Sequence, residues 1–79
     1  MDKGKRMNLG KMKPGQQGQI IRLCYIDTGF LHKLMALGVV PGERVVLLQT
    51  FPTFVVRIGY TQIAMDRLLA ESVEVDIGG

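Results

Sequence analysis

Cys24 and His32 are the residues of this 79-residue chain with the most evident chemical potential, because each is the only one of its type. A cysteine and a histidine can act as nucleophile and base when sulfur and imidazole lie within hydrogen-bond reach. The two lie eight positions apart with Asp27 between them, and this spacing does not establish that their side chains meet. The sequence therefore favours a protein that is not an enzyme.

The same two residues are the candidates for a metal site. A structural zinc site needs about four cysteine or histidine ligands at paired spacings, and this chain has one residue of each type. His32 with Cys24 or a carboxylate would form an incomplete site for Fe(II) or Zn(II), completed by a second subunit or by water. We expect no required cofactor and only weak metal binding.

Glycines in the turn-rich segments do not form a phosphate-binding loop, because neither GxxxxGK(S/T) nor a helix-opening GxGxxG is present. Each is better explained as a turn or a helix cap. The single cysteine excludes an internal disulfide, which favours a reducing, cytoplasmic environment. We find no apolar stretch of the roughly 18 residues that a membrane span needs.

The net charge is +3, and five of the ten basic residues lie in the first thirteen positions: Lys3, Lys5, Arg6, Lys11 and Lys13. A basic arm attracts phosphates or an acidic partner. Nucleic-acid binding on a small barrel also needs surface aromatics among the basic residues. The candidates are Tyr25, Phe51, Phe54 and Tyr60, with Arg22, Arg44 and Arg57. The acidic C-terminal segment opposes a phosphate backbone, so nucleic-acid binding is the alternative function.

The elements that would position these residues are short. Alternating or continuous apolar runs predict strands over residues 19–25, 43–51, 54–58, 61–66 and 73–77. Helical spacing of apolar residues covers 30–37, preceded by the capping sequence Asp27-Thr28-Gly29. Residues 67–72 have room for one helical turn. The first eight residues show no periodicity and are expected to be loose.

Four Gly-containing sites mark the ends of these elements. Pro14-Gly15 and Pro41-Gly42 are turn signals, because proline presets φ and glycine accepts a positive φ. Gly38 stands where a left-handed residue ends a helix. Gly59-Tyr60 fits a two-residue hairpin link. The helix over 30–37 is too short to persist alone in water, so it must be held by packing.

Five short strands in one small domain indicate a closed or nearly closed barrel. We interpret the helix over 30–37 as a lid on one opening of this barrel. A domain of this size buries only about 60% of the surface that its unfolded chain exposes, so part of the lid is expected to remain available to a partner. The candidate partner-binding residues are Leu31, Lys33, Leu34, Met35 and Val39, with Arg57. Alternatively, the apolar residues of this set only plug the barrel.

Three segments of the chain, in this order, resemble the FeoA family. The first is L-x-x-M-x-P-G-x-x-G-x-I beginning at Leu9, the second LHKLMALGVVPGERVVLL beginning at Leu31, and the third FVVRIGYTQIAMDRLLAESVEV beginning at Phe54. The FeoA family comprises small cytosolic accessory proteins of bacterial ferrous-iron uptake. A related domain is fused to the C-terminus of iron-dependent repressors.

The resemblance implies a mainly β fold: an SH3-like barrel of about five strands, with a short helix between the first two and a helical turn before the last. The domain organisation that we expect is a flexible basic arm over 1–8, an FeoA-type domain over 9–77 and a disordered end at 78–79. The resemblance implies no enzyme activity.

The resemblance also implies a partner, the membrane ferrous-iron permease FeoB, whose cytosolic part is a GTP-binding domain. Contact with the membrane would then be indirect. Stimulation of GTP hydrolysis, a scaffold for the transporter and metal-responsive regulation all remain open, as does a homodimer. The family often has arginine where this chain has Lys33. Lysine keeps the charge but lacks the planar fork that binds a carboxylate through two hydrogen bonds.

Overall fold

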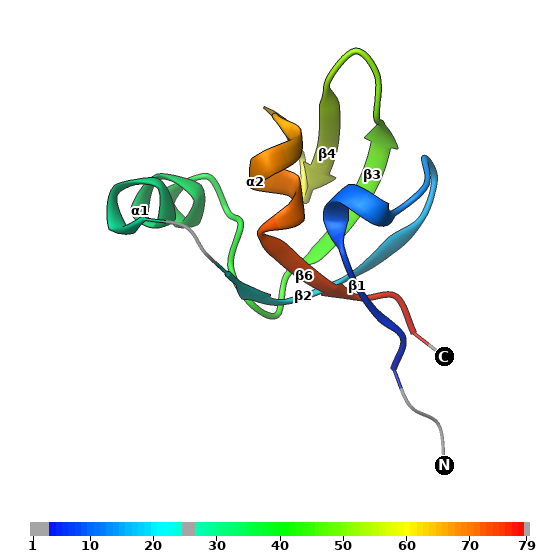
Figure 1. Cartoon of the computed structure of the whole chain (residues 1–79). Helices are drawn as coiled ribbons and strands as arrows, with labels where there is room; N and C mark the ends of the chain where they lie inside the picture. Colours follow the sequence, from blue (N-terminus) through cyan, green and yellow to red (C-terminus); the bar gives the residue numbers. More distant parts are fainter. Residues whose placement is uncertain (1–3, 25–26, 79) are drawn as a thin grey trace.

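A computed structural model describes residues 4–24 and 27–78 of the chain, which form six antiparallel strands, two α-helices and one 3-10 turn (Figure 1). The strands are β1 (Arg6–Asn8), β2 (Gln17–Leu23), β3 (Arg44–Gln49), β4 (Phe54–Ile58), β5 (Thr61–Met65) and β6 (Val73–Asp76). The helical elements are η1 (Leu9–Lys11), α1 (Thr28–Ala36) and α2 (Arg67–Glu71). The mainly β class, the helix between the first two predicted strands and the helical turn before the last strand are confirmed.

The strands follow the order β1-β6-β2-β3-β4-β5 in a single sheet. Within the described residues no pairing joins β1 to β5, so the sheet curls without closing (Figure 1). Of the two expected forms, a closed or a nearly closed barrel, the closed form is therefore wrong. No helix in the part of the chain that the structure describes is long and apolar enough to cross a bilayer.

The added edge strand β1 differs from the expectation that the first eight residues are loose. Arg6 to Asn8 pair with Asp76 to Glu74 of β6. The backbone N–H of Lys5 donates to Gly78 O at 3.0 Å, and that of Ile77 donates to Lys5 O at 2.8 Å. These bonds also order Gly78, which was expected to be disordered. Residues 1–3 and Gly79 lie outside the described part.

The core is formed by the inward faces of the strands. Alternation places Val45 and Leu47 of β3, and Phe54, Val56 and Ile58 of β4, inside the sheet. Gly18 of β2 is needed where β2 and β6 approach closely, because an added Cβ would lie 2.6 Å from the carbonyl oxygen of Asp76. The predicted strand positions are confirmed here, although Tyr25, the predicted end of the first strand, lies outside the described residues.

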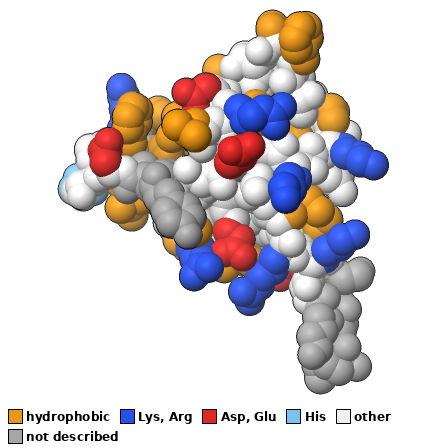
Figure 2. Space-filling model, viewed as in Figure 1, with side chains coloured by type: hydrophobic (Ala, Val, Ile, Leu, Met, Phe, Trp, Pro, Cys, Tyr) orange, Lys and Arg blue, Asp and Glu red, His pale blue; other side chains and the backbone are white. Residues whose placement is uncertain are grey.

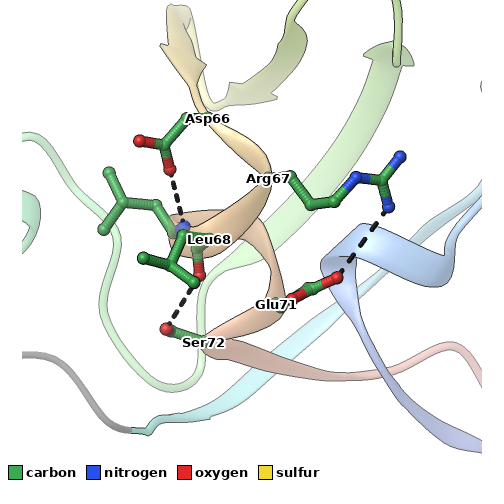
Figure 3. Close-up of polar contacts among 6 residues, drawn as sticks. Asp66, Arg67, Leu68, Glu71 and Ser72 are labelled. Carbon is green, nitrogen blue, oxygen red and sulfur yellow. Dashed lines mark hydrogen bonds and ion pairs between the residues drawn. The ribbon is translucent and has the colours of Figure 1, made fainter.

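One side of the core is covered by η1 and α2, which pack against each other and against β6. They contribute the buried residues Leu9 and Ala70. The carboxylate of Asp66 caps α2 by accepting the N–H of Leu69 at 2.8 Å, and the hydroxyl of Ser72 donates to Leu68 O at 3.0 Å (Figure 3). The interpretation of α1 as the lid is therefore corrected, because α1 projects beside the sheet and buries one residue of its own (Figure 1).

The joint between α1 and β3 is a capping motif followed by a turn. The N–H of Gly38 donates to Met35 O at 3.0 Å, and the N–H of Val39 donates to Leu34 O at 2.9 Å. This pair of bonds, with Gly38 at a φ of 102°, is the Schellman motif that ends a helix. Pro41-Gly42 then forms a turn in which the N–H of Glu43 donates to Val40 O at 3.2 Å, with Gly42 at a φ of 96°. The motif directs Leu34 and Val39 into the core.

Candidate functional site

The most distinctive surface of the molecule is the exposed apolar part of α1. Among the nine residues of this helix, Leu34 alone is buried, and Leu31 is half-buried. Phe30 and Met35 expose 49% and 43% of their surface, and Leu37, which caps the helix, exposes 45%. We call Phe30, Met35 and Leu37 the α1 surface. The helix and its cap thus expose three large apolar side chains, whereas the helix buries one.

The α1 surface flanks the buried residue on both sides. In a helix with about 3.6 residues per turn, Phe30 and Leu37 lie on one side of Leu34 and Met35 lies on the other. Figure 2 shows hydrophobic side chains at the surface of the projecting part of the molecule, while many lysine and arginine side chains lie on the opposite side of this view. Leu68 of α2 is 75% exposed and points away from Arg67 (Figure 3).

Charged residues border the α1 surface. Asp27 caps α1, since its carboxylate accepts the N–H of Phe30 at 3.0 Å. Asp27, Gly29, Phe30 and Lys33 line a shallow hollow of about 260 Å³. An apolar centre with a polar rim is the usual organisation of a protein-binding surface.

The predicted partner-binding residues fall into three groups in the structure. Leu34 and Val39 belong to the core, whereas Lys33 and Met35 are exposed and Leu31 is half-buried. Arg57 is exposed on β4 and so belongs to a different element from the other candidates.

The residues that sequence reasoning left out are Phe30, Leu37 and Leu68. A signal was available for the first two. When a glycine such as Gly38 ends a helix, the Schellman motif places the residues at the positions of Leu34 and Val39 in a hydrophobic contact. The other apolar residues of the helix, Phe30 and Leu37 among them, can then remain at the surface. No comparable signal marks Leu68, because one helical turn shows no periodicity.

The candidate metal ligands are not part of a cluster. His32 is exposed on α1, and Cys24 follows β2, where its N–H donates to Ser72 O at 2.6 Å. Among residues 4–24 and 27–78, no three His, Cys, Asp or Glu side chains are grouped so that they could hold a metal ion. Metal binding by His32 and Cys24 stays a prediction.

The candidates for nucleic-acid binding are scattered. Phe54 is buried, and Arg22 forms a 2.6 Å ion pair with Glu74 of the neighbouring strand, which raises the pKa of Arg22. Phe51 lies in the β3–β4 loop and Tyr60 in the β4–β5 turn. Tyr25 lies outside the described residues. Among the described candidates, Phe51 and Tyr60 lie at opposite ends of β4 and Phe54 is buried, so these aromatic side chains do not form one binding face and the nucleic-acid alternative is not favoured.

A comparison with models of known protein families identifies the family of this chain. The family model described as the FeoA domain matches residues 7–77. The chain belongs to the FeoA family. Among proteins with curated functions, none matches this FeoA domain.

Solved structures share the fold of this FeoA domain. FeoA from Chlorobium tepidum is 26% identical over 90% of this chain and 70% of that one, with a TM-score of 0.84. A zinc complex of Stenotrophomonas maltophilia FeoA, described as an SH3 domain protein, is 24% identical over 89% of each chain, with a TM-score of 0.78. T. acidophilum IdeR is 19% identical over 98% of this chain and 36% of that one, with a TM-score of 0.84. The fold is therefore SH3-like, as the sequence resemblance implied.

Proposed function

We propose that this chain is a non-enzymatic accessory protein of ferrous-iron uptake that acts in the cytoplasm by binding the cytosolic GTP-binding part of an FeoB-type permease. Membership of the FeoA family supports the transport context. The description of the S. maltophilia relative also connects that protein with activation of ferrous iron transport. The observation that carries the binding role is the exposure of Phe30, Met35 and Leu37 around a single buried leucine.

The energetics of the α1 surface agree with a binding role. Covering the remaining exposed area of one such side chain stabilises a complex by about 1 kcal/mol. Three side chains therefore supply only part of what a specific complex requires, because association also costs translational and rotational freedom. The interface would extend to Leu68, which is exposed on α2, and to the charged rim of Asp27 and Lys33.

The composition of α1 indicates which effect its binding would have on the partner. A residue that stimulates GTP hydrolysis is typically an arginine presented to the phosphates. The helix α1 contains no arginine and one lysine, Lys33. The proposal is accordingly that α1 attaches the protein to its partner, as a scaffold or by stabilising one state of the transporter.

A binding measurement with substituted α1 tests the proposal. Met35→Asp places a charge in the apolar interface and is expected to weaken binding to the permease's cytosolic domain by about 10-fold or more. Ala36→Asp is the matched control, because Ala36 is exposed on the same helix outside the α1 surface. Titration calorimetry with and without GTP gives both affinities, and circular dichroism checks the fold. Wild-type affinity in folded Met35→Asp and Leu37→Asp variants would remove α1 from the interface.

A further inference from the structure

A second surface feature lies between the β3–β4 loop and the beginning of α2. It is a groove of about 240 Å³ whose walls include Phe51, Pro52 and Thr53 on one side and Asp66 and Arg67 on the other. The groove is separate from the α1 surface, because it is lined by residues of the β3–β4 loop, β4 and the start of α2 and by none of α1. It therefore needs its own explanation.

One side of the groove is aromatic. Phe51 is 85% exposed in the loop, so its ring is available to a ligand. Phe54 is buried beside it, and the guanidinium carbon of Arg67 lies 5.2 Å from the centre of the Phe54 ring. This cation–π contact fixes the direction of the Arg67 side chain. A charged group is thus held near an exposed aromatic ring.

The polar groups of the groove differ in how many hydrogen bonds they already make within the chain. Thr53 donates its hydroxyl to Met65 O at 3.0 Å, and one oxygen of Asp66 accepts the N–H of Leu69 at 2.8 Å. Arg67 approaches Glu71 only to 3.9 Å, which is longer than a hydrogen bond. Within the described part of the chain, the guanidinium therefore keeps its donors for a ligand, and Asp66 keeps its second oxygen.

We propose that this groove binds an extended peptide segment of a partner protein that carries a carboxylate next to an aromatic or large aliphatic side chain. The apolar side chain lies on Phe51, and the carboxylate pairs with Arg67 through two parallel hydrogen bonds. The second oxygen of Asp66 accepts a backbone N–H of the peptide. This goes beyond the proposed docking through α1, because the two surfaces use different residues.

The charges of the groove favour a peptide over a nucleotide. The charged side chains at the groove are one cation, Arg67, and two anions: Asp66 in its wall, and Glu71, which lies 3.9 Å from the guanidinium of Arg67. Both carboxylates repel a doubly charged phosphate group more strongly than they repel the single charge of a peptide carboxylate. A peptide offers both a carboxylate for Arg67 and an N–H donor for Asp66, so its groups match both side chains.

A peptide titration tests this assignment. The probe is acetyl-Gly-Ser-Phe-Glu-Ser-Gly-amide, added to the isotope-labelled full chain at low salt while backbone NMR signals are followed. We expect the amides of Phe51, Thr53 and Arg67 to shift and those of residues 30–37 to stay. Replacing the peptide's Glu by Gln should weaken binding about 5-fold, because a charge-assisted pair is lost.

Substitutions in the chain provide the second arm of the test. Arg67→Gln is expected to weaken binding of the Glu peptide about 5-fold and to remove the preference over the Gln peptide. Arg44→Gln is the matched control and should bind as the wild type does, because Arg44 is exposed at the end of β3 that lies away from the β3–β4 loop. Phe51→Ser removes the exposed ring without disturbing the core, so it decides the matter if Arg67→Gln does not fold.

Three results would overturn the proposal. The first is an unmoved spectrum at low-millimolar peptide, and the second is equal affinity for the Glu and Gln peptides. The third is a shift of the groove amides by AMP at concentrations where the peptide causes none, which would assign the groove to a nucleotide. None of these depends on the permease, so the docking of α1 is tested separately.

Discussion

At the scale of single residues, Gly38 determines which side of α1 is buried. Its φ of 102° lies in the left-handed region, which glycine adopts without the steric cost that a Cβ imposes. The motif that it completes turns Leu34 and Val39 inward together. Met35 and Leu37 are the large apolar residues between them and are left at the surface, so one glycine sets the position of the proposed interface.

We expect Gly38→Ala to lower the free energy of unfolding by about 1–2 kcal/mol, because alanine is strained at this φ. Urea denaturation followed by circular dichroism measures the change. Gly29→Ala is the control, since Gly29 lies in the same helix without a positive φ. It should leave stability within about 1 kcal/mol or raise it. Equal losses in the two variants would contradict the role given to Gly38.

At the scale of elements, α1 and α2 are held in different ways. α2 lies against η1 and β6 and buries Ala70 completely. α1 depends on Leu34 from within the helix and on Val39 after it. A short helix with one buried residue gains most of its stability from that anchor and from its caps. α1 is thus the element that opens most readily.

Removal of the cap of α1 should destabilise this helix without destabilising the sheet. Asp27→Ala deletes the acceptor of the Phe30 N–H, and a lost cap costs about 1 kcal/mol. We expect amide hydrogen exchange to accelerate over residues 31–37, with little change in the exchange of β4. The wild-type helix should already exchange faster than β4, because local opening requires less burial to be lost. Uniform acceleration through the sheet would mean that α1 unfolds only with the whole domain.

The anchor of α1 predicts a contrast between two leucines. Leu34→Ala removes a buried side chain and is expected to cost about 2–4 kcal/mol of unfolding free energy. Leu37→Ala removes a side chain that is 45% exposed, and the cost should stay within about 1 kcal/mol. Thermal or urea unfolding of both variants gives the comparison. A larger loss for Leu37→Ala would show that the buried face of α1 is assigned incorrectly.

The elements were predictable from sequence where they are long enough to show a period. The alternation of Phe54, Val56 and Ile58 and the cap-to-glycine pattern of α1 each correspond to an observed element. β1 has three residues, which is too short for a pattern, and its pairing with β6 depends on a contact between the two ends of the chain. The open sheet could not be predicted either, because closure depends on strand curvature that apolar periodicity does not report.

At the scale of the whole molecule, the two proposed surfaces lie on different sides of α2. The α1 surface is apolar with a charged rim, and the groove at Arg67 combines an aromatic ring with a cation. Lysine and arginine side chains are spread over much of the visible face (Figure 2). Sequence patterns found the apolar helix, but the groove joins residues of the β3–β4 loop to residues of α2, and only the fold brings these together.

The central claim is that α1 is the attachment site for the transporter. Hydrogen–deuterium exchange of the full chain, measured alone and with the permease's cytosolic domain, tests it most directly. We predict that residues 30–37 and Leu68 become protected in the complex, while the tip of the β4–β5 hairpin at Gly59 and Tyr60 exchanges as before. A stable complex in which α1 exchanges at its free rate, with protection confined to other strands, would contradict the account.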